Sequence, residues 1–88
     1  NNSNSDNLPQ IEISIDDKDI YLNDLILKMN FANSKSEIRK LVKNNGIKIN
    51  RSLLTEELKV ISIEDFTEDN EILVSLGKKK HFLIKLKN

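Results

Sequence analysis

The stretch SKSEIRKLVKNNGIKIN, residues 34–50, constrains the fold most strongly because its hydrophobic pattern changes period at one glycine. Ser34 and Glu37 have the spacing of a capping box, which predicts that a helix begins here. The buried stripe of this helix is predicted to contain Ile38, Leu41 and Val42. Gly46 is expected to end the helix as a left-handed C-terminal cap. Beyond Gly46, apolar and polar residues alternate, which predicts a strand.

The flanking segments complete an α+β pattern. An earlier helix is expected to end near Asn30, with an apolar stripe of Leu22, Leu25, Ile26 and Met29. Residues 31–33 would then join the two helices as a hairpin. Strands are predicted at residues 10–15, 47–50, 59–63, 72–76 and 81–86, with a helical turn at 62–65 and a lysine-rich turn at 77–80. The predicted fold class is α+β, a helical hairpin packed on a small antiparallel sheet.

The formal net charge is zero, yet the charges are arranged in blocks of alternating sign. Residues 1–24 hold six acids and one base, and residues 52–76 hold seven acids and one base. Residues 25–51 hold seven bases and one acid, and residues 77–88 hold five bases and no acid. Because blocks of like charge tend to mark interaction surfaces, we expect the two basic blocks to contact a partner.

The basic residues of the second helix share one face. At about 100° per residue they span an arc of about 140° on the side away from the apolar stripe. They are Lys35, Arg39, Lys40 and Lys43. The basic face is expected to continue onto Lys48 and Arg51, and residues 78–80 form a second lysine cluster. Phosphate backbones are common partners of such surfaces, although a solvated helix exterior that complements the helix dipole is an alternative.

The remaining reactive residue types match no active site. The chain has no cysteine, which excludes disulfides and thiolate metal sites, and its single histidine, His81, is expected to be structural or solvent-exposed. The carboxylates of residues 16–19 and 68–71 do not have the spacing of a calcium-binding loop. Gly46 and Gly77 indicate turns and not a phosphate-binding loop. We predict no catalytic residue, no metal site, no cofactor and no membrane segment.

The N-terminal residues differ in composition from the rest. Residues 1–7, NNSNSDN, are entirely polar and are predicted to form a disordered linker. The predicted binding domain covers residues 8–88. The chain begins with asparagine, so we expect it to be a piece of a longer protein.

Residues 34–50 resemble the αL-motif RNA-binding domain that occurs in a small-subunit ribosomal protein, pseudouridine synthases, a heat-shock ribosome-binding protein and bacterial tyrosyl-tRNA synthetases. That family has a helical hairpin with a serine-capped basic second helix, a glycine stop and a short strand ending in Asn. The segments LPQIEI at 8–13 and SLGKKKHFLIKL at 75–86 resemble the C-terminal domain of the synthetases. Two residues depart from the family pattern. Arg51 stands where glycine is usual, and Ile38 stands where a small residue is usual.

The resemblance implies a domain that binds tRNA(Tyr), chiefly at its variable arm and anticodon stem, while other domains of the parent carry out aminoacylation. It also implies a partner in the catalytic domain of the parent, a homodimeric parent, a monomeric fragment, and a location in the bacterial cytoplasm or an organellar matrix. The predicted RNA-binding residues are Lys35, Ser36, Arg39, Lys40, Lys43, Lys48, Arg51, Lys78, Lys79 and Lys80.

Two alternatives remain open from the sequence. The same module could belong to a pseudouridine synthase or a ribosome-associated factor and bind rRNA, although there it commonly precedes the enzyme domain. The charge blocks could instead pair between acidic and basic faces of a protein-interaction domain. That alternative predicts self-association that salt weakens, with no preference for RNA.

Overall fold

The computed structural model describes residues 8–16 and 19–87. Its elements, in chain order, are β1 (Gln10–Ile13), β2 (Ile20–Tyr21), α1 (Leu22–Lys28), α2 (Lys35–Lys43), β3 (Ile47–Ile49), β4 (Ser52–Leu53), β5 (Val60–Ile61), the 3-10 helix η2 (Ile63–Asp65), β6 (Glu71–Leu76) and β7 (Lys80–Leu86). The predicted linker, residues 1–7, lies outside the described residues. The α+β class is confirmed.

The main sheet has the strand order β1-β7-β6-β3-β4 among the described residues. Strands β6 and β7 form an antiparallel hairpin in which Val74 pairs with Phe82, and β3 and β4 continue the antiparallel pairing. The prediction of a wholly antiparallel sheet is wrong at one edge, where β1 pairs with β7 in parallel. Parallel strands need a long crossover, and here nearly the whole domain lies between the two strands.

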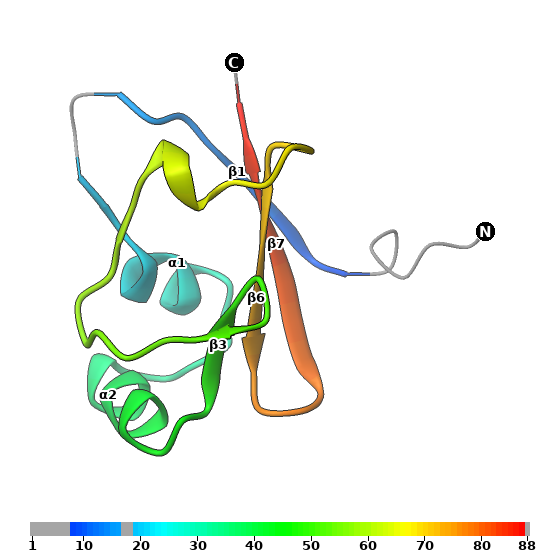
Figure 1. Cartoon of the computed structure of the whole chain (residues 1–88). Coiled ribbons are helices and arrows are strands. Elements are labelled where there is room, and N and C mark those ends of the chain that lie inside the picture. The colour runs from blue at the N-terminus through cyan, green and yellow to red at the C-terminus, as the bar shows by residue number, and fades with distance from the viewer. Residues whose placement is uncertain (1–7, 17–18, 88) are drawn as a thin grey trace.

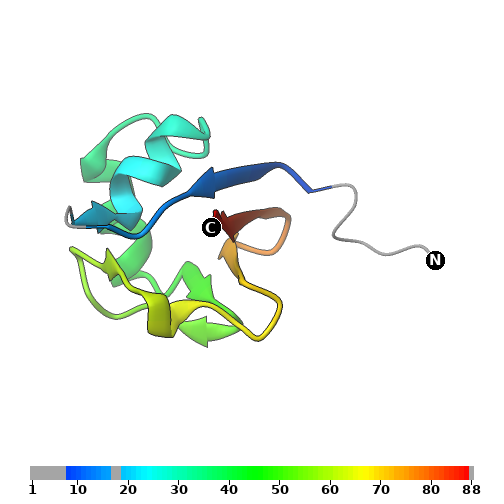
Figure 2. The same cartoon turned by 90° about the horizontal axis from the view of Figure 1, so that it is seen from above.

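Both helices cover one face of this sheet (Figures 1 and 2). Successive residues of β6 and β7 point to opposite sides of the sheet. The side that faces the helices is buried, and Ser75 and Leu83 on the other side are buried as well. The fully buried side chains at this interface include Leu22, Ile26, Ile38, Ile47, Ile72, Val74, Phe82 and Ile84. Phe31, which follows α1, packs on Phe82 with ring centroids 5.0 Å apart. The core therefore fixes the helical hairpin on the sheet.

The two helices end in the same way, with asparagine in the left-handed conformation. Asn30 has φ 62° and Asn45 has φ 59°. After α2, the N–H of Asn45 donates to Val42 O and the N–H of Gly46 donates to Leu41 O, the pattern of a Schellman motif. The prediction that Gly46 provides the left-handed cap is therefore wrong. Gly46 is suited to its position because an added Cβ would lie 3.2 Å from Leu41 O.

The chain between β3 and β6 was the least well predicted. Residues 59–63 were predicted as one strand, but β5 covers Val60–Ile61 only and pairs with β2 in a separate two-stranded sheet. Strand β4 was not predicted at all. The helical turn at 62–65 is confirmed as η2, where Ser62 N–H donates to the Asp65 carboxylate at 2.8 Å and completes a capping box.

Candidate nucleic-acid interface

Helix α2 is held at its start by side-chain caps and along its length by the core. Ser34 Oγ accepts a hydrogen bond from the Glu37 N–H at 3.2 Å, as the sequence predicted. The Glu37 carboxylate accepts from the N–H of Asn33 at 2.7 Å, one residue before the position that a capping box would use. Ile38 and Val42 are buried against the sheet. The opposite face of α2 is therefore turned to solvent in a fixed orientation.

That exposed face carries the predicted cations. Ser36, Arg39, Lys40 and Lys43 border a shallow hollow of about 220 Å³. No salt bridge links Arg39, Lys40 or Lys43 to an acid within the described part of the chain. By contrast, the half-buried Lys59 and Lys85 pair with Asp65 and Glu71. The α2 cations thus remain available to an external anion.

Lys35 stands at the N-terminal edge of the same helix. Its Nζ lies 3.5 Å from the Asp24 carboxylate of α1. Both side chains are more than half exposed, so the pair is screened by water and contributes little to stability. Lys35 can therefore exchange this carboxylate for a phosphate at small cost.

Lys48 and Arg51 do not continue the α2 face, contrary to the sequence-based expectation. Ile47 and Ile49 of β3 pack toward the core, so Lys48 between them lies on the side of the sheet away from the helices. Together with Lys78 it borders a separate hollow of about 550 Å³. This hollow is lined by Leu8, Lys48, Arg51, Leu73, Ser75, Gly77, Lys78 and His81. The basic residues therefore occupy two surfaces of the domain.

The turn between β3 and β4 presents Arg51 in a strained conformation. Asn50 has φ 51° and Arg51 has φ 73°, and two successive residues of positive φ are characteristic of a type I′ hairpin turn. Asparagine tolerates this conformation. Arginine stands where the resembled family usually has glycine, and its left-handed conformation raises the free energy of the folded state by about 1–2 kcal/mol. The side chain of Asn50 offsets part of this cost. Its Nδ2 donates to Asp65 O at 2.9 Å, and its Oδ1 accepts from Leu73 N–H at 2.9 Å.

The lysine-rich turn between β6 and β7 lies at the lower end of the molecule in Figure 1, where the Gly77 N–H donates to Gly46 O just beyond the C-terminal end of α2. Lys78, Lys79 and Lys80 share a hollow of about 390 Å³ with Glu37 and Leu41 of α2. Lys80 is already part of β7, and Gly77 has φ 69° in the turn. This turn therefore brings the second lysine cluster to the flank of α2 that carries Glu37 and Leu41.

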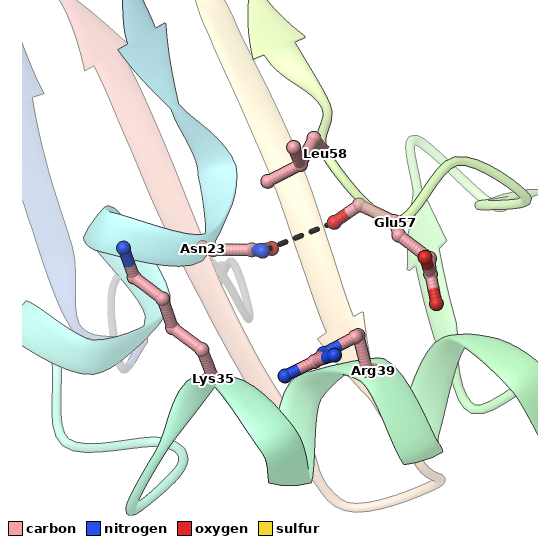
Figure 3. Close-up of a pocket in the computed structure, with 5 residues that line it drawn as sticks. All are labelled: Asn23, Lys35, Arg39, Glu57 and Leu58. Carbon is pink, nitrogen blue, oxygen red and sulfur yellow. Dashed lines mark hydrogen bonds between the residues drawn. The ribbon is translucent and has the colours of Figure 1, made fainter.

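A pocket on the other flank of α2 was missed by sequence reasoning (Figure 3). It has a volume of about 250 Å³ and is lined by Asn23, Lys35, Arg39, Glu57 and Leu58. Asn23 falls within the first helix, where nothing in the pattern marked it. Leu58 is an apolar residue in an acidic segment, and its isolation was the only signal that the sequence offered.

His81 has a structural environment. Its Nδ1 lies 2.9 Å from Ser75 Oγ, and its Nε2 lies 3.2 Å from the backbone oxygen of Lys78. Residues 8–16 and 19–87 contain no group of three or more His, Asp or Glu side chains that could hold a metal ion. Among these residues there is also no helix with the length and apolar character needed to cross a membrane.

In the described part of the chain, a small α+β domain presents cations without an acidic partner from one face of a capped helix, and these are features of a nucleic-acid-binding domain. The family model of the tyrosine–tRNA ligase SYY-like C-terminal domain matches residues 2–84, so the chain belongs to this family. The predicted resemblance to the C-terminal domain of the synthetases is thereby confirmed.

Similar proteins agree with this assignment. A tyrosine–tRNA ligase from Pelagibacter ubique (strain HTCC1062) is 45% identical over 87 residues, which cover 97% of this chain and 21% of the relative. A tyrosine–tRNA ligase from Mycoplasma capricolum subsp. capricolum is 39% identical over 80 residues, which cover 91% of this chain and 19% of the relative. A third, from Agrobacterium fabrum (strain C58), is 34% identical over 83 residues, which cover 92% of this chain and 20% of the relative. The chain thus spans about a fifth of the length of these relatives. Because all three relatives are tyrosine–tRNA ligases, they favour a synthetase as the origin of this domain over a pseudouridine synthase or a ribosome-associated factor.

Proposed function

We propose that this chain is the tRNA-binding appendage of a tyrosine–tRNA ligase and that it holds tRNA(Tyr) through the exposed face of α2. The observation that carries the proposal is a set of cations on that face that form no salt bridge with any acid of residues 8–16 and 19–87: Arg39, Lys40 and Lys43. Membership of the synthetase C-terminal family supports tRNA as the polyanion.

The geometry of α2 suits a phosphate backbone. Arg39 and Lys43 are four residues apart, so they lie about 6 Å from each other along the helix axis. That separation is comparable to the distance between neighbouring phosphates of one strand. The arginine can donate two parallel hydrogen bonds to a phosphate, whereas each lysine acts as a point charge. We propose that the strands contacted are those of the variable arm and the anticodon stem.

The lysine turn supplies a second contact in this proposal. Lys78, Lys79 and Lys80 share a hollow with Glu37 and Leu41 on one flank of α2, and they would add a second set of positive charges there. Lys48 and Arg51, on the other side of the sheet, would meet a different part of the RNA. Each of these residues neutralises one phosphate at most, so the α2 array and the turn together account for most of the electrostatic attraction.

The activity and other partners of the whole protein are part of the same proposal. Other domains of the parent would activate tyrosine and charge the tRNA, and this chain would contact the catalytic domain in a cytoplasmic or organellar homodimer. In isolation the chain would be a monomer.

Lysine acetylation with and without a tRNA(Tyr) transcript tests the proposed surface. We expect bound tRNA to reduce acetylation of Lys40 and Lys43, because a phosphate that accepts a hydrogen bond from Nζ blocks the amine. Lys87 serves as the internal control, because it is exposed and follows the end of β7 that lies opposite the lysine turn. Mass spectrometry of the digested chain gives both values in one sample. Equal protection of Lys87 and Lys43, or no protection of Lys43 at saturating tRNA, would contradict the proposal.

A further inference from the structure

The pocket in Figure 3 contains a buried hydrogen-bond acceptor that has no partner in the described part of the chain. Asn23 of α1 is only 3% exposed. Its Nδ2 donates to the backbone oxygen of Glu57 at 3.0 Å, which ties α1 to the segment before β5. Its Oδ1 accepts no hydrogen bond from any residue that the structure describes. Buried polar atoms of folded proteins are nearly always paired, so this oxygen calls for a donor.

The walls of the pocket differ in chemistry from one side to the other. Lys35 and Arg39 line it from α2, as Figure 3 shows, and the ammonium of Lys35 lies beside α1, where its Nζ is 3.5 Å from the Asp24 carboxylate. Leu58 forms the opposite wall with an apolar side chain that is 64% exposed. The carboxylate of Glu57 points away from Asn23 in the same view. A cationic wall, an apolar wall and a buried acceptor are thus combined in about 250 Å³.

We infer that this pocket receives one unpaired nucleotide of the bound RNA. The base would lie against Leu58 and donate an N–H hydrogen bond to Asn23 Oδ1, and its phosphate would contact Lys35 and Arg39. Proteins commonly recognise RNA by taking up unstacked bases of loops and bulges in this way. The inference rests on the proposed function, because the phosphate contacts belong to the flank of the same α2 interface.

The fit requires a small movement of one wall. Asn23 Oδ1 is shielded from solvent, so an entering base must displace a neighbouring side chain. Leu58 is the wall that moves at least cost, because most of its surface is already in water. Any of the four bases carries an N–H donor. The pocket therefore defines a nucleotide-binding site without choosing the base.

The test measures the affinity of the 88-residue chain for a tRNA(Tyr) transcript over a series of salt concentrations. Leu58→Ser removes the apolar wall at an exposed position, so the fold is preserved. We expect it to weaken binding about tenfold at every salt concentration, since losing one base contact leaves the number of phosphate contacts unchanged. Ile63→Ser is the matched control. Ile63 is 56% exposed but belongs to η2, outside the pocket, and its replacement should leave the affinity unchanged.

A third variant separates this inference from the proposed function. Lys40→Glu with Lys43→Glu alters the α2 face outside the pocket and should reduce the slope of log affinity against log salt. If this variant binds weakly while Leu58→Ser binds like the unmodified chain, the nucleotide pocket is refuted and the α2 interface stands. Equal losses for Leu58→Ser and Ile63→Ser would also refute the pocket. If neither the lysine variant nor Leu58→Ser weakens binding, the proposed function itself is wrong.

Discussion

Reversing two charges of α2, by Arg39→Glu with Lys43→Glu, is expected to weaken tRNA(Tyr) binding about a hundredfold at a fixed, near-physiological salt concentration. Both side chains are exposed and project from a capped helix whose other face is buried. Their charges are therefore held in a fixed array, and each reversal removes one phosphate contact and adds a repulsion. Because neither residue contributes to the core, the fold should survive the change.

The control for this result reverses two lysines of the β6–β7 turn, Lys78→Glu with Lys79→Glu. These residues are also exposed, but they lie on a turn, so each loses more conformational freedom when it meets a phosphate. We expect a clearly smaller loss of affinity. Filter binding at one salt concentration gives both values, and a circular dichroism melt verifies that each variant is folded. If the turn variant fails to bind while the α2 variant binds normally, α2 is not the main RNA surface.

Replacing Asn50 by alanine is expected to destabilise the domain by about 3 kcal/mol. The substitution removes both side-chain hydrogen bonds, to Asp65 O and from Leu73 N–H, and leaves the Leu73 N–H without its partner inside β6. It also places alanine at φ 51°, a conformation that asparagine adopts more readily. For a domain of this size such a loss is a large part of the total free energy of unfolding.

Asn45→Ala separates the two contributions. Asn45 also has positive φ, but it follows α2 at an exposed position, and its side chain forms no hydrogen bond with residues 8–16 or 19–87. Asn45→Ala should therefore lower the free energy of unfolding by only about 1 kcal/mol, because alanine is less favourable than asparagine in the left-handed conformation and no side-chain hydrogen bond is lost. Urea unfolding of the two variants gives both free energies. Equal losses would mean that the Asn50 side-chain bonds do not stabilise the link between the β3–β4 turn, η2 and β6.

The elements with strong local signals were predictable from the sequence. The apolar spacing of α2, its Ser34 cap and the apolar runs at 72–76 and 81–86 all depend on neighbours within a few residues. The structure confirms the helix, its cap and the strands β6 and β7. The Ser62–Asp65 capping box was found for the same reason. Such signals depend on helical and strand periods and require no knowledge of the tertiary fold.

The errors arose where the outcome depends on distant parts of the chain. The parallel pairing of β1 with β7 joins residues about seventy positions apart, and no local pattern specifies it. The alternation with Ile47 and Ile49 already implied that Lys48 lies on the side of the sheet opposite these two residues. The basic face of α2 was nevertheless expected to include Lys48, because this residue follows α2 closely in the sequence. The pocket at Asn23 and Leu58 depends on the packing of α1, α2 and a loop against one another. The left-handed cap of α2 was assigned to Gly46, but the adjacent Asn45 adopts this conformation instead.

The salt dependence of tRNA(Tyr) affinity tests the central claim most directly. If the chain neutralises about five phosphates, log affinity should fall with log salt at a slope of roughly −3.5 to −4.5. With Arg39→Glu and Lys43→Glu, two of those contacts are lost, and the slope should become shallower by roughly 1.4 to 1.8. A slope near zero for the unmodified chain, or the same slope for both chains, would contradict a phosphate-binding surface on α2.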